Sequence, residues 1–205
     1  MRLIRQIYIC SHNQVLRVVL SLGVFLGFYC SFLGVAKIAE FPDHQGLKNV
    51  VFIENATLFL NGRAVHRRYF FDIYEVSLFL KDLQKNPEDI IQSSELKFAR
   101  MKFLRDLKAE DLKDGFSSSF NDNCLDICEI LKSDVERFLT FIPDMAEDTV
   151  IEFIFYPDKT RVLASDNREL VIQSSVFSKV LLRSWLGASP PSERFKKELL
   201  GLSTH

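Results

Sequence analysis

Apolar and polar positions divide the chain into three parts. Residues 18–36 form an uncharged apolar run, and residues 37–49 are polar with one Pro and one Gly. Residues 50–205 mix strand-like and helix-like patterns without a repeat or a break rich in Gly, Ser or Pro. Such shifts mark a leader and a linker ahead of a folded unit. We therefore predict a signal peptide or N-terminal membrane anchor over residues 1–36, a linker over 37–49 and one domain over 50–205.

Strand-like patterns dominate the beginning of this domain. The segment Thr57–Leu60, the pair Asn61-Gly62 and a long apolar run predict a strand, a tight turn and a second strand, because Asn-Gly favours two-residue hairpin turns. The run Tyr69–Leu80 has aromatic and aliphatic residues at both odd and even positions. We expect this strand to be buried on much of both faces, or to be bent by a bulge.

Helix signals follow, interrupted by further strands. Asn86-Pro87 and the two acids after it are typical of a helix start, and apolar residues spaced by four predict a helix over about 107–124. A capping box at Ser133 and Glu136 predicts a helix that ends near Pro143. We expect two more helices, over 175–186 and 190–201, and four more strands, over 96–104, 149–156, 161–164 and 170–172.

With a third strand counted ahead of the first helix, the resulting order of elements is β-β-β-α-β-α-α-β-β-β-α-α. Strands grouped at both ends, with helices between and after them, are typical of the α+β class. We therefore predict a largely antiparallel sheet with helices on one face.

Composition narrows the function classes. The net charge is −1, which gives no basic excess for nucleic-acid binding. Four His and four Cys are scattered, so no metal site is predicted, and no sequence motif for a nucleotide, zinc or a serine nucleophile occurs. The 19 Phe are the unusual count, which we interpret first as core packing and second as the lining of a ligand site.

Charges around the apolar run predict export. Arg2, Arg5 and Arg17 precede it and Lys37 follows it, and basic residues ahead of an apolar run keep the N-terminus in the cytoplasm. A signal peptide cleaved after Ala36 is favoured, and 19 uncharged residues also suffice for an uncleaved anchor. We therefore expect a periplasmic protein, or one anchored to the inner membrane and facing the periplasm.

Two cysteines remain in the predicted domain. Cys124 and Cys128 stand four apart in a helix-like stretch. A disulfide across one helical turn is strained, so we predict two buried free thiols in preference to a bridge.

Several segments together resemble the chalcone isomerase-like family. The stretch LNGRAVHRRYFFDIYEVSLFL (60–80) resembles the family's opening motif, and FSKVLLRSWLGASPPSERFKKELLG (177–201) resembles its ending. The segments KFLRDLKAEDLKDGF (102–116) and RFLTFIP (137–143) with TVIEFIFYPDKTRVLASDNREL (149–170) follow in the same order and spacing. The resemblance covers about residues 50–201 and is carried by the ordered set of motifs.

This resemblance implies a fold and a choice of functions. The expected fold is an open-faced β-sandwich, an antiparallel sheet backed by helices with a cleft between them. Plant members close a chalcone into a flavanone without a cofactor, and other relatives bind fatty acids through an arginine. Members most like this chain are exported bacterial proteins of unassigned activity.

One position departs from the family motif. Aligned without a gap, His66 stands where the family has its arginine, and Arg67 and Arg68 follow. Histidine is largely neutral at pH 7 and lacks the two-pronged donor of arginine, which lowers the expectation of catalysis. No catalytic residue is assigned.

Candidate ligand contacts nevertheless gather around this position. His66, Arg67 and Arg68 form either an anion clamp or, the favoured interpretation, a solvated strand start. Tyr74 is either a hydroxyl donor or, more simply, a core residue bonded to backbone. The remaining candidates are Phe70 and Phe71 for an apolar wall, and Arg100, for which an outward-facing position is the default.

Three functions stay open at this stage. The leading hypothesis is a non-catalytic binder of a small amphipathic ligand such as a fatty acid. The alternatives are a cofactor-free isomerase or lyase acting on a phenolic or enone substrate, and a cell-envelope interaction protein without a small ligand. No cofactor is implied, and the oligomeric state is left open.

Overall fold

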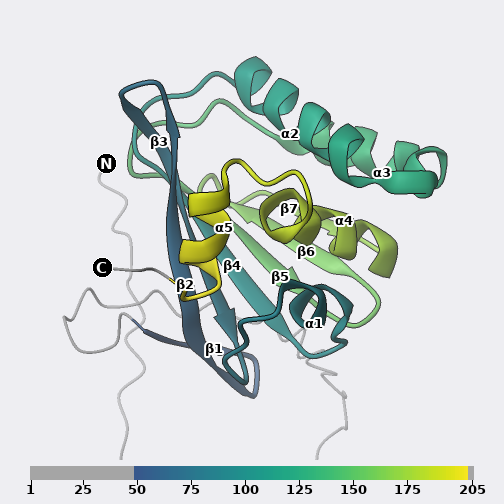
Figure 1. Ribbon diagram of the computed structural model, residues 1–205. Helices are drawn as coiled ribbons and strands as arrows, with labels where there is room; N and C mark the ends of the chain where they lie inside the picture. Colours follow the sequence, from purple (N-terminus) through teal and green to yellow (C-terminus); the bar gives the residue numbers. More distant parts are fainter. Residues whose placement is uncertain (1–48, 203–205) are drawn as a thin grey trace, which may run out of the picture. The chain divides into compact units, whose positions relative to one another are not determined.

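A computed structural model of the chain describes residues 49–202 (Figure 1). The predicted leader and, apart from Asn49, the predicted linker lie outside the described residues. No helix within 49–202 has the length and apolar character needed to span a membrane. The strands are β1 (Val50–Ile53), β2 (Ala56–Arg68), β3 (Phe71–Leu80), β4 (Lys97–Phe103), β5 (Val150–Phe155), β6 (Thr160–Ala164) and β7 (Glu169–Ile172), and the α-helices are α1 (Pro87–Gln92), α2 (Ala109–Asn123), α3 (Cys128–Phe141), α4 (Ser175–Leu186) and α5 (Glu193–Leu199).

The seven strands form one antiparallel sheet in which spatial order equals sequence order. The helices cover one face of it, and the order of elements matches the predicted one (Figure 1). Helix α4 lies at the centre of the helical layer, where it contacts α1, α2, α3 and α5. Its buried side chains, including Phe177, Leu181 and Trp185, join those of β3, β4 and β5 in the main core. The α+β prediction is confirmed.

A β-bulge replaces the predicted turn at Asn61-Gly62, which is a correction. Strand β2 runs straight through the pair, and the register passes from Leu60 opposite Phe79 to Gly62 opposite Leu78. Asn61 is the extra residue, so Leu60 faces one side of the sheet and Gly62 the other. The chain reverses later, at Tyr69 and Phe70.

Tertiary partners explain why the pair bulges. The Asn61 side-chain amide donates to the carbonyl of Leu199 at 3.1 Å and accepts from the backbone N–H of Gln84 at 2.8 Å. A Cβ on Gly62 would collide with the backbone carbonyl oxygens of Glu198 and Leu199. The pair is therefore the docking point of α5, and the first and last motifs of the sequence meet here.

A second, smaller core lies on the opposite face of the sheet. It contains Leu58, Phe79 and Phe98 from the adjacent strands β2 to β4, together with Ile154 of β5 and two residues of β1, Val51 and Ile53. The Tyr156 hydroxyl, just after β5, donates to Glu54 in the β1–β2 turn at 2.6 Å. The first and fifth strands meet in this way because the sheet curls, as in a half-barrel. Of the run Tyr69–Leu80, only Val76–Leu80 is buried on both faces, and the first residues are exposed, so the prediction of burial on both faces holds for its second half.

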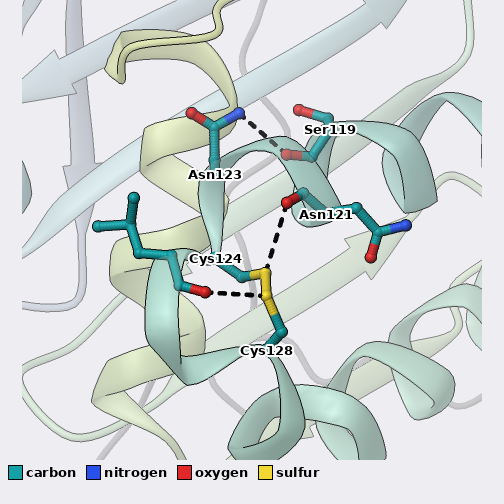
Figure 2. The surroundings of a disulfide bond; sticks show 6 residues. Ser119, Asn121, Asn123, Cys124 and Cys128 are labelled. Atoms are coloured by element: carbon teal, nitrogen blue, oxygen red, sulfur yellow. Dashed lines mark hydrogen bonds between the residues drawn. A yellow bond between two sulfur atoms is a disulfide. The ribbon is translucent and has the colours of Figure 1, made fainter.

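Two predictions about the α2–α3 region are wrong. Helix α3 begins at Cys128 instead of near Ser133, and Cys124 and Cys128 form a disulfide with Cα atoms 5.0 Å apart (Figure 2). The prediction of free thiols assumed one continuous helix. Instead, α2 ends at Asn123, and Leu125, which begins a short 3-10 turn, takes a left-handed backbone conformation with φ of 53°. This break brings the two cysteines together.

Candidate functional site

A cavity of about 540 Å³ lies beneath α2, at the end of the sheet where β2 and β3 form their hairpin. Its volume falls in the range of small-molecule sites. Apolar and polar side chains share the wall, and the polar ones include one histidine, two arginines, three aspartates and four serines. The lining residues that matter below are His66, Arg68, Ile73, Tyr74, Met101, Arg105, Leu107, Leu112, Gly115, Phe116 and Trp185.

His66 and Tyr74 form the inner polar contact of the cavity. They stand opposite each other on β2 and β3, and their rings stack with centroids 4.9 Å apart. A second register irregularity follows them, where Ile73 is the extra residue and also lines the cavity. Two side chains of β3 therefore reach the cavity in succession, which a regular strand would not allow.

Burial keeps both rings neutral. Desolvation lowers the pKa of His66 below its usual value, and the neighbouring Arg68 guanidinium lowers it further. Desolvation also raises the pKa of Tyr74 well above its usual value. No described residue forms a hydrogen bond with the Tyr74 hydroxyl. This finding contradicts the favoured interpretation, in which the tyrosine is bonded to backbone. The cavity therefore offers a neutral phenol donor beside a neutral imidazole.

Arg68 and Arg105 supply positive charge at the rim. Both line the cavity, and neither pairs with a carboxylate within residues 49–202. The Arg105 guanidinium lies over the Phe71 ring, 4.7 Å from its centroid. Three carboxylates, Asp106, Asp111 and Asp122, also border the cavity. The arginines are thus available to an anionic ligand group, while the acids exclude a uniformly anionic one.

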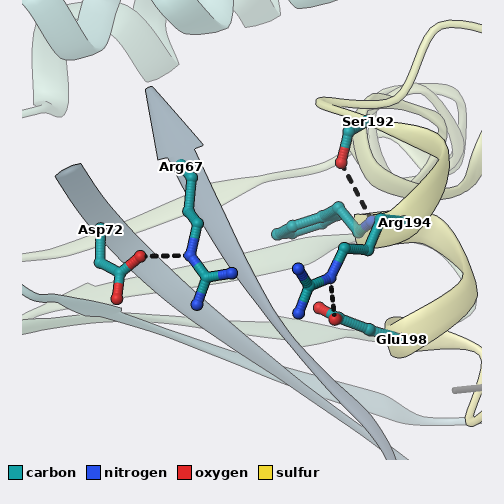
Figure 3. Close-up of polar contacts among 6 residues, drawn as sticks. Arg67, Asp72, Ser192, Arg194 and Glu198 are labelled. Carbon is teal, nitrogen blue, oxygen red and sulfur yellow. Dashed lines mark hydrogen bonds and ion pairs between the residues drawn. The ribbon is translucent and has the colours of Figure 1, made fainter. Parts of the chain in front are cut away.

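The two consecutive arginines of β2 have different surroundings. Arg67 does not line the cavity; its Nε donates to Asp72 at 2.5 Å (Figure 3). Figure 3 also shows the Arg194–Glu198 ion pair of α5 across from it, with the Arg194 Nε 2.6 Å from Glu198. Of the proposed clamp, the structure therefore brings His66 and Arg68 together and leaves Arg67 in a surface ion pair.

Phe70 and Phe71 do not line the cavity, contrary to the expectation of an apolar wall. Phe70 is 97% exposed and Phe71 57% exposed. The cause is the position of the turn, because a chain that reverses at Tyr69 and Phe70 carries these rings at the hairpin tip. Arg100 lies on the opposite face of the sheet, 2.6 Å from Glu152, so it too is outside the cavity.

Comparison with known proteins agrees with this architecture. The family model for chalcone isomerase-like proteins matches residues 43–201. The chain belongs to the chalcone isomerase-like family. A crystal structure of an Arabidopsis thaliana fatty-acid binding protein superimposes with a TM-score of 0.55 at 13% identity, covering 74% of this chain and 96% of that one. No curated protein sequence matches the chain.

Sequence reasoning missed the α2 side of this chalcone isomerase-like cavity. The apolar residues spaced by four that predict a helix over about 107–124 include Leu112 and Phe116, and both line the cavity at the margin of the core. Between them, Gly115 has open space where a Cβ would stand. The signal in the sequence was a glycine beside the apolar stripe. A helix packed tightly along that face would leave no open space next to the glycine. Trp185 contributes from α4, and no local pattern distinguishes it from other core residues.

Proposed function

We propose that this protein binds a small amphipathic carboxylate, most simply a fatty acid, without transforming it. The observation that carries the proposal is a cavity of about 540 Å³ whose wall has an apolar part, including Leu112, Phe116 and Trp185, and whose rim has two arginines that form no ion pair with a described carboxylate. Apolar walls retain an acyl chain by the hydrophobic effect, and a guanidinium pairs with a carboxylate through two parallel hydrogen bonds. The name of the Arabidopsis structure gives independent support for a ligand of this class.

The single tryptophan is a built-in probe of occupancy. Trp185 lines the cavity and is the only Trp of the chain. A fatty acid carrying bromine on its acyl chain should quench Trp185 emission in a saturable titration, and unbrominated palmitate should reverse the quenching. A delipidated protein whose Trp185 emission does not respond to micromolar fatty acid would contradict the proposal.

The adjacent residues Arg67 and Arg68 provide a matched test of which side chain binds the carboxylate of the ligand. Arg68→Gln should weaken palmitate binding about tenfold or more, because a hydrogen bond to a charged group is worth about 1.5–3 kcal/mol. Arg67→Gln removes a charge one position away but outside the cavity, so its affinity should equal that of wild type. Equal losses in the two variants would mean that only net charge matters.

Export is part of the same proposal. Its support is the run of 19 uncharged residues after three arginines, together with the Cys124–Cys128 disulfide, since disulfides persist in oxidising compartments. A fusion of the full chain to a reporter enzyme that is active only outside the cytoplasm tests it. An inactive but stable fusion would exclude export.

An isomerase remains the second candidate because His66 and Tyr74 converge inside the cavity. Such a reaction requires a cation to stabilise the developing oxyanion, and the lowered pKa of His66 leaves that role to Arg68. Turnover of a panel of chalcones, abolished by Tyr74→Phe, would favour the isomerase over a passive binder.

A further inference from the structure

Three consecutive aromatic side chains project from the β2–β3 hairpin. We call residues 69–71 the aromatic tip. Tyr69 is 86% exposed, Phe70 97% and Phe71 57%. Large aromatic rings usually contribute to a core, and a cluster of them in water is a sign of an interaction site. The tip has no core to join, because the cavity beside it is walled by other residues.

The backbone conformation of the tip is energetically unfavourable for a residue that has a side chain. Tyr69 occupies the left-handed region with φ of 58°, as the first of the two turn residues between the paired Arg68 and Phe71. Glycine is strongly preferred in that position of a two-residue hairpin turn, and an ordinary residue there costs roughly 1 kcal/mol or more. A tyrosine that serves only the turn would be a poor choice.

Two arginines beside the tip form no ion pair within residues 49–202, although three aspartates border the cavity that they line. Arg67 is neutralised by Asp72, at 2.5 Å, and Asp106 accepts a hydrogen bond from the backbone N–H of Glu147. Arg68 and Arg105 flank the tip without a carboxylate partner in the described part of the chain, and Arg105 stacks on the Phe71 ring. Exposed aromatics beside such cations match the interface of a bilayer, where rings lie at headgroup depth and basic residues contact anionic lipids.

We propose that the aromatic tip inserts into the headgroup region of an anionic lipid bilayer. Insertion removes Tyr69 and Phe70 from water, while Arg68 and Arg105 contact lipid phosphates. Both arginines also line the cavity, so docking would open the cavity mouth toward the membrane. Passage of a lipid-derived ligand from membrane to cavity rests on the proposed binding function, whereas insertion of the tip does not.

Depth-dependent fluorescence quenching tests the insertion in the full chain. The variant Phe70→Trp is reconstituted with vesicles of phosphatidylcholine and phosphatidylglycerol that carry brominated acyl chains. Leu83→Trp is the matched control, because Leu83 is also exposed but lies beyond the other end of β3. The wild-type chain reports Trp185 alone, including any quenching by lipid that enters the cavity, and its signal is subtracted.

Insertion predicts several-fold stronger quenching at position 70 than at position 83, and less quenching after Arg68→Gln with Arg105→Gln. Equal quenching at the two positions, or none at position 70, would overturn the proposal. So would emission at position 70 that is already blue-shifted without lipid in a protein that elutes as a dimer, because a second copy would then cover the tip. Failure of cavity binding would appear separately, as an absent response of Trp185 to fatty acid.

Discussion

The two ends of β2 differ in how the structure uses them. At the anchored end, residues 58–64, Asn61 bonds to two other segments and Gly62 lies directly against the backbone of α5. At the open end, residues 65–71, His66 and Arg68 line a cavity and three rings are exposed. One continuous strand thus combines a rigid attachment with a functional rim, and rigid attachment is what holds binding groups in place.

Gly62→Ala tests the anchored end and should have the largest effect. Because a Cβ would collide with backbone carbonyls, α5 must move, and we expect the free energy of unfolding to fall by about 3 kcal/mol. Urea denaturation followed by circular dichroism measures it. The control is Gly115→Ala at the open end, where the Cβ meets open space. A similar loss of stability in Gly115→Ala would mean that the collision with α5 is not the cause of the loss in Gly62→Ala.

A pH dependence at the anchored end should come next in size. Lys97, opposite Leu80, is buried and donates to the carbonyls of Ser93 and Glu95 at the end of α1. Burial lowers its pKa to about 8. Between pH 8 and the unfolded-state value near 10.5, the unfolded chain binds more protons than the folded one, so stability rises with pH across this window.

The expected gain is about 2–3 kcal/mol relative to Lys97→Met, in which the titrating group is absent. Urea denaturation of both proteins at pH 7.5 and at about pH 10 gives the difference, and other titrating groups cancel in the comparison. Parallel pH profiles for the two proteins would show that Lys97 is charged in the fold at both values.

Removal of the disulfide tests how firmly α2 is held above the cavity. Asn123, next to Cys124, donates to the carbonyl oxygens of Ser119 and Ser189 at 2.9 and 3.0 Å, which ties the end of α2 to the segment after α4. Replacing Cys124 and Cys128 by Ser should cost about 2 kcal/mol for so short a loop and weaken palmitate binding. Unchanged affinity would show that Asn123 alone holds the cavity wall.

Gly115→Leu should have the smallest effect on stability and a selective one on binding. Replacing a glycine within a helix stabilises the fold by about 0.5–1 kcal/mol, and the leucine side chain would enter the cavity. We expect equal or higher stability with loss of the Trp185 response to brominated fatty acid. Retained binding in a folded Gly115→Leu protein would place the ligand outside this cavity.

The sequence by itself determined the order of elements, because helix and strand periodicity and local caps are short-range properties. Asn86 is an example: its side chain accepts from the Glu88 backbone N–H at 3.0 Å, as the pattern predicted. The motif set also established the family, and it offered His66 and Tyr74 as candidate ligand contacts, although other interpretations were favoured for both until the structure placed them at the cavity.

Only the tertiary structure decided where the β2–β3 turn lies and which side chains reach the cavity. Asn61-Gly62 has the local preference of a turn, but contacts with Leu199 and Gln84 make it a bulge, and this moves the true turn to Tyr69 and Phe70. The exposure of Phe70 follows from that shift, whereas Arg67 and Arg68 are separated because successive side chains of a strand point to opposite faces. Local preferences amount to about 1 kcal/mol per residue, so a few long-range contacts outweigh them, and such contacts leave no periodic trace in the sequence.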